Sequence, residues 1–279
     1  MSLPIGKLVE NINEIKEAIT KVKENSDAEW YTNFYVNDDA INRWITFKQI
    51  YLINFADSFF VIRDRKSFIH LYFSSNNINS LRRELLLLKK NIAVPTVVDL
   101  LAKQDSVKLL FENCGYIHYC KLTRMFKRNS PNNKICIDEE NFANADEAED
   151  VLAIINENMD PLCEQIPDLS EIKIAINARS ILVKRDNKNN LLALLYFERS
   201  GRTAYLRYWV TAKQAQGLGY GKSLYKLYES LNLDVVQFRL WVRDDNSKVK
   251  RIYENYGYVY DRLKDEVFVL GVHDSEDHT

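Results

Sequence analysis

Three of the eight glycines in this chain fall within five positions, at Gly217, Gly219 and Gly221. A strand-like run, 203–210, precedes them, and apolar residues at helical spacing follow from Leu224 onward. A glycine-rich turn between a strand and a helix leaves backbone N–H groups free at the helix N-terminus. There the donors and the helix dipole both favour a negatively charged ligand. The pattern therefore predicts a loop that binds phosphate or pyrophosphate.

Two well-known phosphate-binding spacings fit this loop poorly. A nucleotide-binding P-loop needs G-x-x-x-x-G-K-[ST]. The end of that motif is present as Gly221, Lys222 and Ser223, but Gln216 stands where its first glycine belongs. The dinucleotide spacing G-x-G-x-x-G lacks its last glycine in both possible frames. A P-loop protein is therefore the outlying interpretation.

A third spacing, [QR]-x-x-G-x-G, fits with Gln216, Gly219 and Gly221, and also fits two residues earlier. We prefer the later frame because it places Leu224 on the buried face of the following helix. This spacing resembles the coenzyme A pyrophosphate loop of the GNAT superfamily of N-acetyltransferases.

A second element downstream supports the resemblance. A strand-like run, 236–242, leads into a helical segment that contains Asn246, Tyr253, Gly257 and Tyr258. Members of the superfamily often carry an Asn near the start of this helix and a Tyr seven residues later. A Gly and an aromatic residue then follow. The two elements together extend the resemblance over roughly residues 135–270.

The resemblance implies that acetyl-CoA is the co-substrate and that the strand before the loop separates from its neighbour. Backbone groups near the end of that strand would then pair with the pantetheine arm, and the N–H groups of the loop would take the pyrophosphate. We hold Asn246 equally as a cofactor contact or as a simple helix cap. The expected cofactor-binding residues are Trp209, Val210, Thr211, Gln216, Gly217, Leu218, Gly219, Tyr220, Gly221, Lys222 and Asn246.

Two side chains are candidates for proton transfer. The phenol of Tyr253 stays protonated at neutral pH and could protonate the leaving thiolate as a general acid. The general base is less evident, because the strand 203–210 carries no carboxylate. Glu198, at the end of the preceding strand, is the nearest candidate, although a solvated strand-end charge is the simpler interpretation.

Composition narrows the classes of partner. The 38 Lys and Arg residues nearly balance the 39 Asp and Glu residues, so no nucleic-acid or membrane-surface partner is expected. There is no apolar run long enough for a transmembrane helix and no signal-peptide core, so we expect a cytoplasmic protein. The four cysteines and four histidines show no metal-ligand spacing, so no metal is expected.

The chain also shows signs of an internal duplication. A polar linker at 127–134 suggests two domains, 1–130 and 131–279. Residues 110–117 read like 252–259, with Phe111 in place of Tyr253. The segment 74–80 is shorter than the glycine loop and has no glycine, and Gln104 stands where Asn246 would be. We infer a degenerate N-terminal GNAT-like domain without a phosphate loop, followed by an acetyl-CoA-binding catalytic domain.

The predicted fold class is α/β, with a mixed central sheet flanked by helices and two similar domains in tandem. In the C-terminal half we expect strands at 134–138, 180–185, 191–198, 203–210, 235–242, 257–262 and 266–270, and helices at 146–160, 169–178, 217–232 and 246–256.

The predicted function is an acyl-CoA-dependent N-acyltransferase that moves an acetyl group to a primary amine by direct attack. The acceptor, a small molecule or a peptide amine, is open, and so is the choice between monomer and homodimer. One alternative is a non-catalytic module that binds or senses coenzyme A. Another is a tandem aminoacyl transferase that uses charged tRNA, which the near-neutral charge and the intact loop disfavour.

Overall fold

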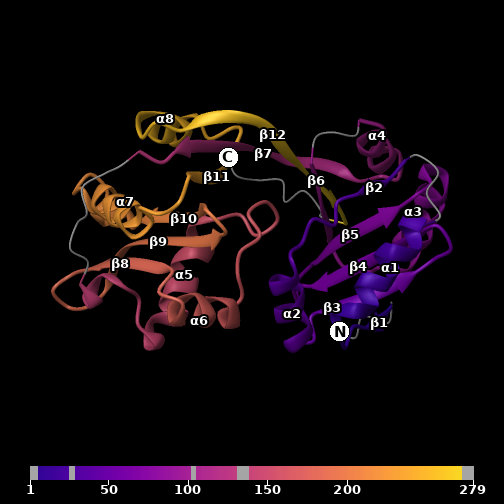
Figure 1. Cartoon of the computed structure of the whole chain (residues 1–279), viewed down its shortest axis with the longest axis horizontal. Coiled ribbons are helices and arrows are strands. Elements are labelled where there is room, and N and C mark those ends of the chain that lie inside the picture. The colour runs from indigo at the N-terminus through magenta and orange to yellow at the C-terminus, as the bar shows by residue number, and fades with distance from the viewer. Residues whose placement is uncertain (1–5, 25–28, 102–104, 131–137, 272–279) are drawn as a thin grey trace. The chain divides into compact units, whose positions relative to one another are not determined.

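The computed structural model describes residues 6–24, 29–101, 105–130 and 138–271 (Figure 1). The chain divides into two compact units. The N-terminal unit comprises Met1–Lys121 with Lys264–Thr279, and the C-terminal unit comprises Leu122–Leu263. Two long strands, β7 (Ile117–Arg128) and β12 (Val259–Leu270), therefore contribute to both.

The sheet of the C-terminal unit has the strand order β7-β11-β10-β9-β8. Only β10 and β11 run parallel, and the other neighbouring pairs are antiparallel. The bounds are β8 Ile181–Arg185, β9 Leu191–Ser200, β10 Thr203–Thr211 and β11 Gln237–Arg243.

Helices cover both faces of this sheet because its strands alternate apolar side chains on both sides (Figure 1). Leu195 and Phe197 of β9 pack in one core with α7 and α8, whereas Leu194 and Tyr196 pack in the other with α5 and α6. The helices are α5 Ala148–Asn158, α6 Leu169–Asn177, α7 Tyr220–Leu231 and α8 Ser247–Asn255, and the 3-10 turns are Glu139–Asn141, Ala145–Glu147 and Lys213–Ala215.

The N-terminal unit repeats this arrangement. Its strands β3, β4, β5 and β6 have the same order and directions as β8, β9, β10 and β11. Helices α1 and α2 pack on one face, and α3 and α4 on the other. The bounds are β1 Lys7–Leu8, α1 Ile12–Glu24, β2 Tyr31–Thr32, α2 Asp38–Thr46, β3 Ile50–Asn54, β4 Ser58–Asp64, β5 Ile69–Ser75, α3 Ile78–Asn91, β6 Thr96–Leu101 and α4 Asp105–Asn113.

The last strand of each half completes the sheet of the other half. In the C-terminal unit β11 pairs antiparallel with residues 122–128 of β7, which follows α4 in the chain. In the N-terminal unit β6 pairs antiparallel with residues 265–270 of β12, which follows α8. The predicted boundary at residue 130 differs from this division. Residues 117–121 of β7 belong to the N-terminal unit and 122–128 to the C-terminal unit, and β12 is divided in the same way between residues 263 and 264.

The end of α4 and the end of α8 share one hydrogen-bonding pattern. Gly115 and Gly257 follow the two helices with φ of 87° and 86°, a conformation that glycine adopts without strain. The N–H of Tyr116 donates to the carbonyl of Phe111 over 3.1 Å, and that of Tyr258 donates to Tyr253 over 3.1 Å. The resemblance between 110–117 and 252–259 thus extends to the backbone.

The predicted fold class is confirmed, and the differences are local. The two strands expected at 257–262 and 266–270 are one continuous strand, β12. Helix α7 begins at Tyr220 rather than at 217, because Gly217 and Gly219 have positive φ. Most of the strand expected at 134–138 lies outside the described residues, and so does Gln104.

Candidate active site

The parallel strands β10 and β11 stay paired over only part of their length. Residues 203–206 of β10 pair with 237–240 of β11, and beyond them no pairing between the two strands continues in the described structure. At this point β10 has a bulge, because Leu206 pairs with Phe197 of β9 and Tyr208 with Tyr196, which leaves Arg207 as the extra residue. A bulge bends its strand and ends regular pairing. The sheet therefore opens between β10 and β11.

A cleft with a volume of about 620 Å³ occupies this opening. It lies entirely within the C-terminal unit. Its lining comes from the ends of β10 and β11, the start of α8 and the connection between α5 and α6. The lining residues are Asn158, Met159, Asp160, Glu164, Arg207, Tyr208, Trp209, Val210, Thr211, Gln216, Trp241, Val242, Arg243, Asp245, Asn246, Val249 and Tyr253.

The backbone of β10 offers hydrogen-bonding groups to this cleft. The N–H of Ala212 donates to the carbonyl of Leu192 on β9 over 2.8 Å. Successive residues of a strand direct their polar groups to opposite neighbours, so Trp209 and Thr211 direct theirs away from β9, toward the opening. The side chain of Gln216 agrees with this assignment, because its amide donates to the Thr211 carbonyl over 3.3 Å.

The glycine loop ends at an uncapped helix N-terminus. Gly219 is the N-cap of α7 with φ of 84°, and no side chain caps the helix. The first helical bond runs from the N–H of Ser223 to the carbonyl of Gly219 over 3.0 Å. The N–H groups of the preceding residues, from Tyr220 to Lys222, precede that first bond and have no partner within the helix. Leu218 and Lys222 are exposed beside them.

Gly221 is required for close packing rather than for its backbone conformation. A Cβ atom at this position would lie 3.1 Å from Oγ1 of Thr211 and 3.2 Å from Nε1 of Trp209. The absence of a side chain therefore allows the first turn of α7 to lie directly against the end of β10. The loop and the free edge of β10 consequently belong to one site.

Tyr253 projects from α8 into the cleft, where it is 8% exposed. Its ring lies 6.0 Å from that of Trp209 and 5.8 Å from that of Tyr258. Burial, and after it the Glu164 carboxylate, raise the pKa of the Tyr253 phenol above its ordinary value. The phenol therefore remains protonated throughout the physiological pH range.

Asn246 lines the same cleft and begins α8. Its side-chain oxygen accepts the N–H of Val249 over 3.1 Å, which is an N-cap interaction. The structure thus gives Asn246 the capping role that was one of its two expected roles.

Glu198 does not line the cleft, unlike the other predicted catalytic residue. It lies near the end of β9, opposite Tyr205, and its carboxylate accepts the hydroxyl of Tyr196 over 2.9 Å. Strands β10 and β11 separate after Leu206. Glu198 lies beside the part of β10 that precedes this separation and is therefore outside the cleft.

Glu164 is a cleft carboxylate that the sequence analysis missed. It comes from the connection between α5 and α6, and it accepts the N–H of Asp160 over 2.9 Å. Burial raises the pKa of its carboxyl above the ordinary value, and the carboxylates of Asp160 and Asp245 add to that rise. The Asp160 N–H and Arg243 oppose it. The only signal in the sequence is an acidic residue in a helix connection, which is common on any surface.

The place of this cleft in the N-terminal unit is filled by the chain itself. Strands β5 and β6 pair only at Ile69–Thr96 and His70–Val97, so they also separate. Strand β2 pairs with the end of β5, and the next residue, Asn33, bridges the gap. The Asn33 amide donates to the carbonyls of Leu71 on β5 and Asp99 on β6, each over 3.1 Å, and its oxygen accepts the N–H of Phe73 over 2.7 Å.

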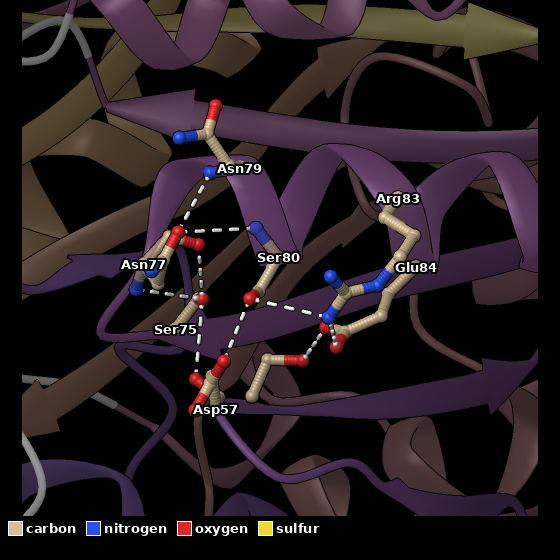
Figure 2. A network of polar contacts seen from close by, with 8 residues as sticks. Asp57, Ser75, Asn77, Asn79, Ser80, Arg83 and Glu84 are labelled. Atoms are coloured by element: carbon tan, nitrogen blue, oxygen red, sulfur yellow. Dashed lines mark hydrogen bonds and ion pairs between the residues drawn. The ribbon is translucent and has the colours of Figure 1, made fainter.

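The helix that corresponds to α7 is capped by its own sequence. The oxygen of Asn77 accepts the N–H groups of Asn79 and Ser80 over 2.9 and 3.1 Å at the start of α3 (Figure 2). Asp57 adds a negative charge there, because its carboxylate accepts the Ser80 hydroxyl over 2.7 Å (Figure 2). With donors satisfied and an acid beside them, this helix end does not favour an anion.

The described residues form neither a metal site nor a membrane-spanning helix. Within those ranges no group of three or more His, Cys, Asp or Glu residues is arranged to hold a metal ion. No helix in the same ranges combines the length and the apolar character needed to cross a bilayer.

Comparisons with known proteins agree with the fold. No family profile matches the sequence, and no curated protein matches it. Among solved structures, a tandem GNAT protein from the clavulanic acid biosynthesis pathway aligns with a TM-score of 0.59 and 10% identity, over 95% of this chain and 96% of that one. A GCN5-related N-acetyltransferase from Sphaerobacter thermophilus gives a TM-score of 0.58 and 11% identity, over 92% of this chain and 91% of that one.

A GNAT-family acetyltransferase from Colwellia psychrerythraea aligns with a TM-score of 0.55 and 11% identity, over 94% of this chain and 98% of that one. At such identities the likeness concerns the fold alone. The chain has the fold of the GNAT superfamily along almost its whole length, in agreement with the resemblance found in its sequence.

Proposed function

We propose that this protein is an N-acyltransferase that transfers an acetyl group from acetyl-CoA to a primary amine, and that it does so in the C-terminal unit. One observation carries the proposal. The edge of β10 that β11 leaves unpaired lines a cleft together with Tyr253, and the uncapped N-terminus of α7 lies directly against that end of β10 through Gly221. A fold alone does not define an activity, so the proposal rests on this site.

The residues present fit an acyl-CoA. A pyrophosphate suits the helix end, where the free N–H groups from Tyr220 to Lys222 and the helix dipole favour negative charge. An extended pantetheine arm, which carries amide groups, suits the edge of β10 at Trp209 and Thr211, where, among the described residues, no strand pairs and the Gln216 amide alone donates to the Thr211 carbonyl. This contact resembles the addition of a peptide strand to a sheet edge. The co-substrate would supply the activated acetyl thioester.

We assign the two proton transfers to Glu164 and Tyr253. Both line the cleft, and the charge of Glu164 acts on the Tyr253 phenol. The pKa of the Glu164 carboxyl is raised toward neutral pH, and a carboxylate with a higher pKa is a better base. The raised pKa of Tyr253 keeps it a proton donor. Two titrating groups in one cleft, one a base and one an acid, divide the two tasks between them.

The roles of the chain's own residues follow from this assignment. Glu164 accepts a proton from the amine as the new N–C bond forms at the thioester carbonyl. Tyr253 donates its proton to the sulfur as the C–S bond breaks, so that an amide and a free thiol leave. Exchange with solvent then restores both side chains. The cleft contributes chiefly by holding the two reactants in line, which supplies much of the acceleration in such transfers.

Thermal unfolding tests this proposal most simply. Acetyl-CoA should raise the melting temperature of the full chain in a saturable way, because a ligand that binds only the folded state stabilises it. ATP and uncharged or charged tRNA are the comparison ligands, since they represent the nucleotide-binding and aminoacyl-transfer alternatives. Release of the coenzyme A thiol in the presence of amines then separates an enzyme from a binding module. Stabilisation by ATP or tRNA but not by acetyl-CoA would contradict the proposal.

A further inference from the structure

The charged groups of the cleft are only partly paired with one another. Arg243 donates to Asp160 over 3.1 Å and to Asp245 over 2.9 Å, so these three side chains form one ion-pair cluster. Glu164 and Arg207 also line the cleft, and neither makes a salt bridge among the residues that the structure describes, although burial raises the pKa of the Glu164 carboxyl and the charge of Arg243 opposes that rise. One carboxylate and one guanidinium of the cleft are therefore not held in a salt bridge within the described ranges.

The position of Arg207 is set by the bulge. As the extra residue of β10, it lies outside the regular pairing with β9, and its side chain is exposed where the strands separate. Its guanidinium carbon lies 5.9 Å from the centre of the Tyr208 ring. Against the effect of burial, the charge of Glu198, with Tyr208 and Tyr196 after it, raises the pKa of the Arg207 guanidinium, and Glu198 also accepts the Tyr196 hydroxyl.

Tyr208 connects the segment that carries Glu164 to the strand that carries Arg207. Its hydroxyl lies 3.0 Å from the backbone carbonyl oxygens of both Glu164 and Gln165, which share its single proton. The connection that carries Glu164 is therefore fastened to the strand residue next to Arg207. The buried Tyr208 therefore fixes the backbone that carries Glu164 to the strand that carries Arg207.

From this geometry we propose that the acceptor is a small zwitterion, an amino acid or a similar amine that also carries a carboxylate. The inference rests on the proposed function, because it names the substrate of the same site. Glu164 would face the amine that reacts. Arg207 would hold the carboxylate, which a guanidinium can grip through two parallel hydrogen bonds. An amine that lacks the carboxylate would leave Arg207 with the Glu198 charge alone and would be a poorer substrate.

Matched pairs of acceptors test the proposal on the full chain. The probes are tyrosine with tyramine, lysine with cadaverine, and leucine with isopentylamine, and the other common amino acids are screened beside them. Release of the coenzyme A thiol from acetyl-CoA is the readout. The carboxylate-bearing member of the best pair should have a kcat/KM higher on the order of 10²-fold, as expected for a charge-assisted contact.

Substitution of Arg207 identifies the contact. R207Q should raise KM for the carboxylate-bearing acceptor on the order of 10²-fold. It should leave its amine partner unchanged, and R207K should fall between. The control is R202Q, which removes an exposed arginine in the turn before β10. The affinity for acetyl-CoA, measured by titration calorimetry, should be the same in all variants.

The outcomes distinguish the two levels of the account. A chain that does not bind acetyl-CoA would overturn the proposed function. A chain that binds acetyl-CoA but prefers the amines, or in which R207Q affects both members of a pair equally, would overturn the zwitterion proposal alone. Where no probe is turned over, saturation-transfer NMR on the coenzyme A-loaded protein decides. Absence of binding by every carboxylate-bearing probe would also overturn the zwitterion proposal.

Discussion

The two units contain the same opening in their sheets and use it differently. Between β5 and β6 the N-terminal unit inserts its own segment, and the Asn33 side chain hydrogen-bonds to both strands. Between β10 and β11 the C-terminal unit leaves a cleft of about 620 Å³. Phe73 of β5 and Trp209 of β10 both lie two residues before the end of their strands. Phe73 packs against Phe111 of α4, and Trp209 packs against Tyr253 of α8.

The N-terminus of the helix that follows each opening also differs between the two units. At α3 the cap Asn77 satisfies two N–H groups and Asp57 brings a negative charge. At α7 the cap is Gly219, which offers no side chain. The comparison teaches that the scaffold alone does not make an acyl-CoA site. A few residues in the turns decide whether its backbone donors are satisfied from within or left for a ligand.

The largest expected effect comes from removing the glycine of the open helix end. Gly219→Val should weaken acetyl-CoA binding by on the order of 10² or more, because a side chain would cover the free N–H groups. Gly201→Val is the control, because both glycines have positive φ and open space around them, so both substitutions strain the backbone without a clash. Calorimetry and circular dichroism measure binding and folding. Full affinity in a folded Gly219→Val protein would refute the loop assignment.

The next effect concerns the base. Glu164→Gln should lower kcat by roughly 10² to 10³, the usual contribution of a general base, whereas Glu198→Gln should change it far less. The pKa of the Glu164 carboxyl lies above its ordinary value of 4.5, and its base form is lost as the pH falls through that raised pKa. The kcat of the wild-type protein should therefore show an acidic limb above pH 4.5 that Glu164→Gln lacks.

The same substitution has an opposite effect on stability. A carboxyl whose pKa is raised by folding destabilises the folded state once the pH exceeds that pKa, and the penalty disappears below the unfolded value. Glu164→Gln removes this penalty, and the amide oxygen can still accept the Asp160 N–H. At neutral pH its melting temperature should equal or exceed that of the wild type. A lower melting temperature together with lost activity would indicate a structural role instead.

The third prediction uses the pair Tyr253 and Phe111. Tyr253→Phe should lower kcat by on the order of 10² while the Kd for acetyl-CoA stays nearly constant, since only a hydroxyl is lost. Phe111→Tyr makes the reverse change in the N-terminal unit, where the ring is fully buried. It should cost about 1–3 kcal/mol of stability for an unpaired hydroxyl and create no activity. Normal turnover by Tyr253→Phe would make Tyr253 structural.

The smallest effect on function and a clear effect on stability are expected at Asn33. Asn33→Ala removes three hydrogen bonds of a buried side chain and should cost roughly 2–4 kcal/mol, measured by denaturant unfolding. Asn37→Ala, which removes one capping bond at α2, is the control and should cost about 1 kcal/mol. Activity of the folded protein should not change. A larger loss from Asn37→Ala would show that Asn33 does not close the gap.

The fold class, the glycine turn before α7 and the place of Tyr253 in α8 could be predicted from the sequence because they depend on local spacing, whereas the roles given to the turn and to Tyr253 stay predictions. Glycine is needed at Gly219 for a positive φ and at Gly221 for close packing, but the sequence shows only a glycine at both positions. Glu164 and Asn33 could not be predicted in this way. Each acts through contacts with strands distant in the sequence, and neither lies in a recognisable motif. The pairing of β7 with β11 and of β12 with β6 could not be predicted from the sequence for the same reason.

The number of acetyl-CoA molecules bound by the full chain tests the comparison most directly. The full chain is needed because a fragment that begins at residue 131 would lack β7, the partner of β11. Titration calorimetry should give one site per chain, abolished by Gly219→Val and kept in Asn33→Ala. Two sites per chain, or a single site that survives Gly219→Val, would contradict the account that only the C-terminal unit holds the co-substrate.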